Sequence, residues 1–272
     1  MSNKTYEEAL AVWRAQADES VRRDWVSLAG LHWLAEGRAS FGSDPACDLV
    51  LPAHAQPLCG ALTLNDGQVL LDAAPGVVLY VNGAACQSAQ LRSDAQGQPD
   101  RVTLGGITMV VIRRGERVGV RLWDSQHPAL RSFGGRRWFP PDPAFRLPAT
   151  FVPYETPKLV PVTNILGDVT ETKVPGAVHF TLAGQALQLD VTGYSQQQLF
   201  VNFRDATSGH ETYGAGRFLS IPIKPAAPLE IDFNYAVSPP CAFTAFATCP
   251  LPLRQNWLQV RVAAGELAPD GH

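Results

Sequence analysis

The sequence predicts a mainly β protein with two β domains. Short apolar runs separated by turn residues recur along most of the chain, a pattern typical of sandwiches and barrels rather than alternating strands and helices. Helical periodicity is confined to the start of the chain, and prolines are concentrated between residues 139 and 161. With 272 residues, 46% of them apolar, the chain is long enough for one large or two ordinary domains.

The first element is a helix, which we expect over residues 3–24. Tyr6, Leu10, Trp13 and Ala17 recur three or four positions apart, with charged residues between them, and so form one apolar face. The apolar stretch 25–33, broken by a glycine, then predicts a strand and a turn.

Short strands follow from residue 39 to residue 120. They end at turn signals such as Pro52, Asn65-Asp66-Gly67 and Asn82-Gly83, the last two being typical of β-hairpins. Helical patterns are missing between these strands, which indicates a β-sandwich. We therefore expect residues 1–138 to form one domain, consisting of the helix and this sandwich.

The proline-dense stretch 139–161 comes next. Proline removes a backbone donor and disfavours both helices and central strands, so we interpret this stretch as an extended connector. Strand patterns resume after it, and the last expected strand is 258–262. Residues 162–272 are thus predicted to form a smaller β-barrel or sandwich, closed by a loop over residues 241–256.

Composition argues against several classes of protein. Charged residues make up 17% of the chain and the net charge is −3, whereas a nucleic-acid-binding protein usually has a strongly basic face. The basic residues that do cluster are interrupted by Glu116 and Asp124, which favours solvated strand edges over an anion-binding face. These basic residues are Arg113, Arg114, Arg117, Arg121, Arg131, Arg136 and Arg137.

The sequence contains no apolar run of the length that spans a membrane, and its first residues lack the apolar core of a signal peptide. Five cysteines, an odd number, suit a reducing compartment. We therefore expect a cytoplasmic protein without a membrane partner.

Residues 39–112 resemble a forkhead-associated domain. Residues 41–45 and 47–52 are similar to the opening strands of that family, and Val81-Asn82-Gly83 is similar to its late asparagine-glycine turn. The resemblance implies a β-sandwich whose loops bind phosphothreonine peptides. However, Ser43 replaces the family's arginine, and residues 55–62 lack its Ser-x-x-His motif. We therefore expect a scaffold that has kept the fold without the phosphopeptide site.

The densest group of polar residues lies between residues 203 and 266. It includes residues 203–218, which read Phe-Arg-Asp-Ala-Thr-Ser-Gly-His-Glu-Thr-Tyr-Gly-Ala-Gly-Arg-Phe, together with Asp232-Phe233-Asn234, residues 239–243 and residues 249–252. This pattern resembles a bacterial family of unknown function, domain of unknown function 1684. Ser238 and Leu253 depart from it, standing where members usually have asparagine and proline. The resemblance implies a relationship to this family, but it does not imply a particular reaction.

Three interpretations of this signature stay open. Its charged groups could pair with one another in a structural network, as buried polar groups must. The leading functional hypothesis is instead that they bind a small polar molecule or a peptide end in a pocket of the C-terminal domain, with Phe203, Tyr213, Phe233 and Trp257 as walls. In that case Arg217 should be partly exposed. The candidate ligand-binding residues are Arg204, Asp205, Thr207, Ser208, Tyr213, Arg217, Asp232, Asn234 and Asn256.

The third interpretation is a hydrolase, so whether the protein is an enzyme is not decided by the sequence. Ser208 or Thr207 would be the nucleophile and His210 the base, with Asp205 or Asp232 as the orienting carboxylate. This interpretation requires His210 within hydrogen-bond reach of a hydroxyl and a carboxylate. The structural network, by contrast, corresponds to an interaction scaffold without a small-molecule site, in which Arg217 is buried and paired with carboxylates.

Metal and cofactor signals are weak. Cys241, Cys249 and His210 are the candidate metal ligands, but the eight-residue cysteine spacing is unlike that of structural zinc sites, so we expect no metal. A disulfide between these two cysteines is a further alternative. The glycine-rich loops that hold nucleotides are missing from the sequence, so we expect no nucleotide cofactor.

Overall fold

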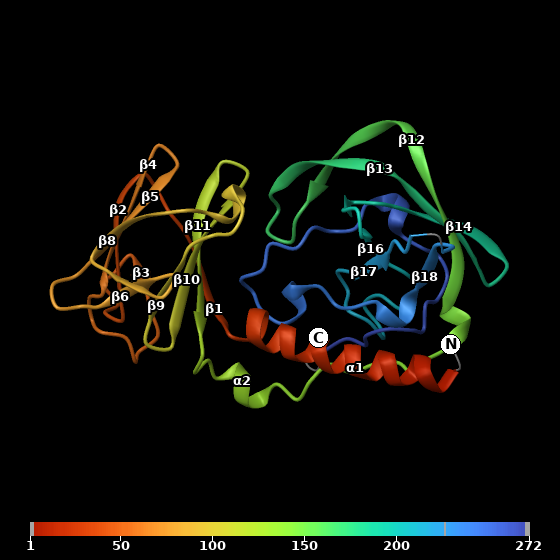
Figure 1. The fold of residues 1–272 in the computed structure, drawn as a ribbon, viewed down its shortest axis with the longest axis horizontal. Coiled ribbons are helices and arrows are strands. Elements are labelled where there is room, and N and C mark those ends of the chain that lie inside the picture. Colours follow the sequence, from red (N-terminus) through yellow and green to blue (C-terminus); the bar gives the residue numbers. More distant parts are fainter. Residues whose placement is uncertain (1–2, 226, 270–272) are drawn as a thin grey trace. The chain divides into compact units, whose positions relative to one another are not determined.

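The computed structural model describes residues 3–225 and 227–269, and it confirms the mainly β fold. The chain forms two compact units (Figure 1). Residues 22–133 make up the N-terminal unit, and residues 1–21 together with 134–272 make up the C-terminal unit.

The N-terminal unit is a sandwich of two sheets around one apolar core. A six-stranded sheet has the order β1-β11-β10-β9-β6-β7, and a five-stranded sheet has the order β3-β2-β4-β5-β8. Fully buried side chains such as Phe41, Leu71 and Leu79 fill the space between them. The strands are β1 (Leu28–Trp33), β2 (Gly37–Gly42), β3 (Leu49–Val50), β4 (Gly60–Asn65), β5 (Gln68–Ala73), β6 (Leu79–Val81), β7 (Ala84–Cys86), β8 (Ser88–Leu91), β9 (Arg101–Leu104), β10 (Ile107–Arg114) and β11 (Arg117–Asp124).

Two of the expected hairpin turns lie in this sandwich. Asp66 and Asn82 both have positive φ, of 49° and 51°, and each is followed by a glycine that also has positive φ. That conformation suits a tight hairpin, so these residues join β4 to β5 and β6 to β7. A short helix, α2 (Ala129–Ser132), ends the unit.

The C-terminal unit contains two small sheets that share a second core. One has the order β14-β13-β12-β18 and the other the order β15-β16-β17. Val178, Val201, Phe203 and Phe233 are fully buried in that core. The strands are β12 (Arg146–Thr163), β13 (Val169–Leu182), β14 (Gln185–Asp190), β15 (Gly193–Tyr194), β16 (Gln198–Phe203), β17 (Arg217–Pro222) and β18 (Glu230–Asp232).

The expected helix is α1 (Asn3–Val21), and it belongs to the C-terminal unit. Tyr6 donates a hydrogen bond to Asp232 at 2.6 Å, and Trp13 packs edge-on against Trp138 and Tyr235. The predicted domain of residues 1–138 therefore differs from the units that form, because the apolar face of α1 packs on residues far along the chain. For the same reason the C-terminal unit is the larger of the two, not the smaller.

The proline-dense stretch also differs from the expected connector, because most of it is the strand β12. Pro148 pairs with Glu230 on β18 and Ala149 N donates to Leu229 O, whereas from Thr150 onward the described strand partner of β12 is β13. One edge of the strand is then free of ladder hydrogen bonds, and proline is tolerated at such an edge. Pro157 falls where the register shifts, between Pro153 and Lys158.

The expected last strand, 258–262, is wrong, because the segment has no strand partner. It runs beside the 203–218 loop, where Ala206 N donates to Val260 O at 3.0 Å. Leu258 N donates to Arg204 O, and both backbone groups of Val262 are bound by the side chains of Asp205 and Arg217, which sequence periodicity does not reveal.

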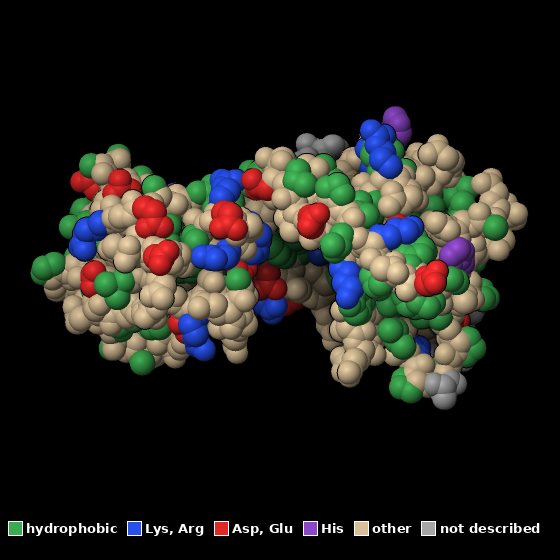
Figure 2. Space-filling view, turned by 90° about the horizontal axis from the view of Figure 1, so that it is seen from above, with side chains coloured by type: hydrophobic (Ala, Val, Ile, Leu, Met, Phe, Trp, Pro, Cys, Tyr) green, Lys and Arg blue, Asp and Glu red, His purple; other side chains and the backbone are tan. Residues whose placement is uncertain are grey.

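The basic cluster of residues 113–137 is divided between the two units. Arg114 pairs with Asp94 at 2.7 Å, and Arg117 lies over the Trp33 ring at 3.8 Å, both in the N-terminal unit. Arg136 pairs with Glu266 in the C-terminal unit. On the face seen in Figure 2, basic and acidic side chains are interspersed. The described helices include none that is long and apolar enough to cross a membrane.

Candidate functional site

The 203–218 loop connects β16 to β17 and is tightly hydrogen-bonded to itself. Phe203 and Arg217 are paired across the two strands at its base. Within it, the backbone oxygen of Thr207 accepts bonds from His210, Glu211 and Thr212. These bonds fold the polar residues of the loop back onto the ends of β16 and β17.

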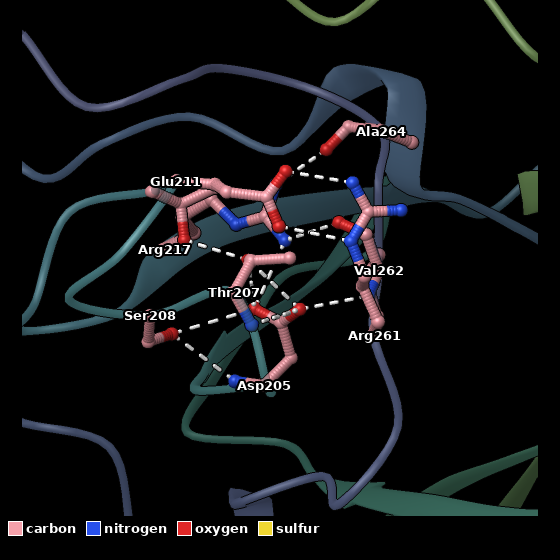
Figure 3. Close-up of polar contacts among 9 residues, drawn as sticks. Asp205, Thr207, Ser208, Glu211, Arg217, Arg261, Val262 and Ala264 are labelled. Carbon is pink, nitrogen blue, oxygen red and sulfur yellow. Dashed lines mark hydrogen bonds and ion pairs between the residues drawn. The ribbon is translucent and has the colours of Figure 1, made fainter.

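Arg217 lies at the centre of this loop and is fully buried. Its Nη2 donates to Asp205 Oδ1 at 3.1 Å and to Val262 O at 3.0 Å, and its Nη1 donates to Ala264 O (Figure 3). Burial lowers the pKa of Arg217, and the Asp205 carboxylate opposes that shift. The partly exposed Arg217 that a ligand site requires is therefore not found, and the contacts are those of the structural network.

Asp205 completes the network. Its carboxylate accepts bonds from Thr207 Oγ1 at 2.9 Å, Thr207 N at 3.2 Å and Val262 N at 2.8 Å. Thr207 Oγ1 also lies 2.8 Å from Thr212 Oγ1. The buried ion pair thus fastens the irregular segment around Val262 and Ala264 to the β16–β17 hairpin.

Ser208 and His210 do not form the arrangement that a hydrolase needs. Ser208 Oγ accepts a bond from Asp205 N at 3.1 Å and lies 3.4 Å from Asp205 Oδ1. His210 is exposed, and among the described residues its ring has no hydrogen bond to a hydroxyl or a carboxylate. The Ser208 hydroxyl caps the turn instead of facing a base.

Three predicted ligand residues bind other parts of the chain through their side chains, and we call them clamps: Asp232, Asn234 and Asn256. Asp232 accepts bonds from Tyr6 and from Asn234 N, while the buried Asn234 amide binds both backbone groups of Asp142. The fully buried Asn256 amide accepts from Asp190 N at 2.7 Å and donates to the carbonyls of Asp190 and Asn202. These three predicted ligand residues hold backbone segments together.

Arg204 is a predicted ligand-binding residue whose side chain stacks on an aromatic ring instead of pairing with a carboxylate that the structure describes. Its guanidinium lies 4.6 Å from the centre of the Trp257 ring, and that of Arg254 lies 4.2 Å from the same ring. Among the described residues, no carboxylate pairs with either arginine. Trp257 was expected as a wall of the site, whereas Arg254 was missed, since an exposed arginine in a short turn carries no sequence signal.

Tyr213 belongs to a third group, with the two candidate metal-ligand cysteines. Tyr213 Oη donates to Cys241 O at 3.1 Å, and Cys241 N donates to Cys249 Sγ at 3.3 Å. His210 is not grouped with them, because the part of the chain that the structure describes contains no cluster of three or more metal-ligand side chains. The cysteines are reduced thiols without a disulfide.

A buried acid was also missed by the sequence analysis. Glu266 is 1% exposed, and its Oε2 accepts bonds from Arg136 Nη1 at 2.6 Å and from Ser238 N at 2.7 Å. Burial raises the pKa of Glu266 to about 7, although the Arg136 guanidinium acts in the opposite direction. Its partner is 130 residues away in the chain, which no local pattern could indicate.

Hollows in the surface lie away from these residues. One, of about 770 Å³, is lined by residues of β12, β13 and β14, among them Thr150, His179 and Gln188. Another, in the N-terminal unit, is lined by Asn82 and Arg101 with their neighbours. None of the predicted site residues lines either hollow.

Comparisons with known proteins give a family but no activity. Among solved structures, an uncharacterized protein of Haloarcula marismortui is 32% identical, with 53% of this chain and 83% of that chain covered and a TM-score of 0.44. The FHA domain of FhaA, solved with the intracellular domain of another protein, is 18% identical over 34% of this chain and 96% of that one, with a TM-score of 0.24. The N-terminal FHA domain of EssC, a component of the bacterial Type VII secretion apparatus, is 17% identical over 35% and 48%, with a TM-score of 0.26.

The comparison with curated proteins gave no match. Residues 131–267 match the family model described as a protein of unknown function, DUF1684. That match spans half of the chain and contains the whole 203–266 signature, so the chain belongs to the DUF1684 family.

Proposed function

We propose that the C-terminal unit binds a small anionic ligand, carrying a carboxylate or phosphate group, at Arg204, Arg254 and Trp257. One observation carries this proposal: two guanidinium groups pack on one indole ring, and neither has a carboxylate partner among the described residues. By contrast, the arginines Arg136, Arg146, Arg217 and Arg261 of the same unit each pair with a carboxylate.

The chemistry of this group favours an anion. A guanidinium that stacks on an aromatic face keeps its N–H edge available, and that edge matches carboxylate and phosphate oxygens in a bidentate arrangement. Two unpaired positive charges against one ring also repel each other. A bound anion would remove that repulsion and would supply the partner that each arginine lacks.

The surrounding backbone positions both arginines. Arg204 N donates to Asn256 O at 3.0 Å, and Leu258 N donates to Arg204 O at 2.8 Å, so the two segments run side by side. The Asn256 clamp holds the short turn that carries Arg254 and Trp257. Asn256 therefore contributes to the proposed site as a positioning residue, one step removed from the ligand.

Gly216 makes room for the Arg204 side chain. A Cβ at this position would lie 2.5 Å from Phe203 O and 3.1 Å from Arg204 Cγ. Gly216 also has a φ of +96°, which residues with a side chain rarely adopt. The glycine-punctuated part of the signature thus supports the position of Arg204.

A titration with inorganic phosphate and with citrate, followed by calorimetry and thermal unfolding, tests the proposal. Wild-type protein should bind and become more stable, by about 2.7 kcal/mol at a ligand concentration one hundred times Kd. Arg204→Gln and Arg254→Gln should each weaken binding at least about tenfold, because each removes a charge-assisted contact.

Arg261→Gln is the matched control, because Arg261 is an exposed arginine of the same unit that pairs with Glu211 at 2.6 Å. It should leave the affinity unchanged. Equal affinities for wild type, Arg204→Gln and Arg254→Gln, or no binding by wild type, would remove the support for this function.

A further inference from the structure

Cys241 and Cys249 come together in the C-terminal unit although eight positions separate them. Cys241 lies in the 3-10 turn Pro240–Ala242, and its backbone N–H donates to the Cys249 sulfur at 3.3 Å. Cys249 is 5% exposed, whereas Cys241 is partly exposed. The two thiols thus share one site in which only Cys241 has substantial contact with solvent.

We propose that Cys241 and Cys249 form a redox-active dithiol that reduces a hydroperoxide and closes to a disulfide. Cys241 is the nucleophile, because it is the thiol that a dissolved oxidant can reach. Cys249 is the resolving cysteine, because its sulfur is adjacent to Cys241 and is shielded from solvent. Neither residue belongs to the proposed anion site, so the two proposals are independent.

The environment of Cys241 favours the thiolate, the reactive form of cysteine. The interaction with Cys249, and after it that with Tyr213, lowers the pKa of Cys241, against the opposing effect of burial. Burial raises the pKa of Tyr213, so its hydroxyl keeps its proton and remains a donor. Tyr213 therefore acts as a positioning residue for the nucleophile.

The other three cysteines have different surroundings. The thiols of Cys47 and Cys59 each donate to a backbone carbonyl at 3.4 Å, and the thiol of Cys86 donates to Ser88 O at 3.0 Å. Burial raises the pKa of Cys59 and the nearby Cys47 adds to that shift, so these two thiols are neighbours of each other. Cys86 serves as the internal reference for reactivity.

The reaction balances with hydrogen peroxide as the oxidant. The Cys241 thiolate attacks one peroxide oxygen, the O–O bond breaks, and the departing hydroxide takes a proton to become water. The Cys249 sulfur then attacks the Cys241 sulfenic acid, the S–O bond breaks, and a second water leaves. Two thiols and one peroxide give one disulfide and two waters.

Mass spectrometry of the full chain after treatment with hydrogen peroxide tests this. The tryptic peptide that contains both Cys241 and Cys249 should lose two hydrogens and regain them with dithiothreitol. Cys241 should be consumed at least about tenfold faster than Cys86, because its surroundings lower the pKa of Cys241. With Cys249→Ser, a sulfenic acid should accumulate at Cys241 and be trapped by dimedone.

Tyr213→Phe separates a positioning role from a merely structural one. It should move the pH profile of Cys241 alkylation to higher pH while leaving that of Cys86 in place. Cys86→Ser is the control that should leave peroxide consumption unchanged. The proposal is overturned if Cys241 and Cys86 are oxidised at the same rate, or if oxidised protein contains no Cys241–Cys249 disulfide. Measuring the thiols directly keeps the test valid even if a variant is less stable.

Discussion

Arg204 and Arg217 belong to one loop and one signature, yet their environments are opposite. Arg217 starts β17, is fully buried, and has its Nη groups bound to Asp205 and to two carbonyls. Arg204 follows β16, stacks on Trp257, and is without a carboxylate among the described residues. Arg217 holds the fold together, whereas Arg204 is the residue proposed to bind a ligand, so a dense run of polar residues is not by itself a site.

The sharpest test of this comparison replaces each arginine in turn. Arg217→Met should reduce the free energy of unfolding by about 3–5 kcal/mol, because Asp205 would be left buried without its counter-charge. Arg204→Met should cost less than about 1 kcal/mol, since no ion pair is lost. Urea unfolding of both variants measures the difference. Similar losses would mean that Arg204 is as much a part of the fold as Arg217.

Glu266 is another buried charged group of the C-terminal unit, and the pH dependence of its contribution to stability can be predicted. Its pKa of about 7 in the folded protein lies above its ordinary value of 4.5, so the folded state holds this proton more tightly than the unfolded state. The stabilisation is complete below pH 4.5 and is lost as the pH rises through about 7. The loss should amount to about 3 kcal/mol.

Unfolding of wild type and Glu266→Gln across that pH range isolates this contribution. The difference between the two should change with pH in the stated direction, since glutamine does not titrate. A constant difference would show that Arg136 keeps Glu266 ionised throughout, as an ordinary ion pair.

Gly216→Ala tests the residue that lies next to Arg217 in the chain and against the Arg204 side chain. The added Cβ would approach Phe203 O and Pro252, and its backbone conformation would be strained, so we expect a loss of about 1–3 kcal/mol together with weaker phosphate binding through Arg204. Gly214→Ala is the control, because its Cβ would meet nothing closer than 3.6 Å. If both variants bind phosphate like wild type, Gly216 does not position Arg204.

Local chemistry accounts for the parts of the fold that the sequence predicted well. The spacing of Tyr6, Leu10 and Trp13 identified the helix, and Asn65-Asp66-Gly67 identified a hairpin, because both signals depend on neighbouring residues alone. The prolines of β12 led to the wrong prediction of a connector. Proline excludes a strand only where a second strand pairs with the edge on which the proline lies, and the sequence does not show this. The prediction of a strand over 258–262 was wrong because the segment is bound to isolated backbone groups of a distant loop and, at Val262, to its side chains.

The sequence by itself determined the alternation of strands and turns, the helix, the family and the group of residues that carries its polar chemistry. Only the tertiary structure decided which of those polar residues are enclosed. Arg217 is bound to carbonyls 45 and 47 residues away, and Glu266 to an arginine 130 residues away. Enclosure of a charge depends on the partners that folding brings to it, and a linear pattern contains no information about those distances.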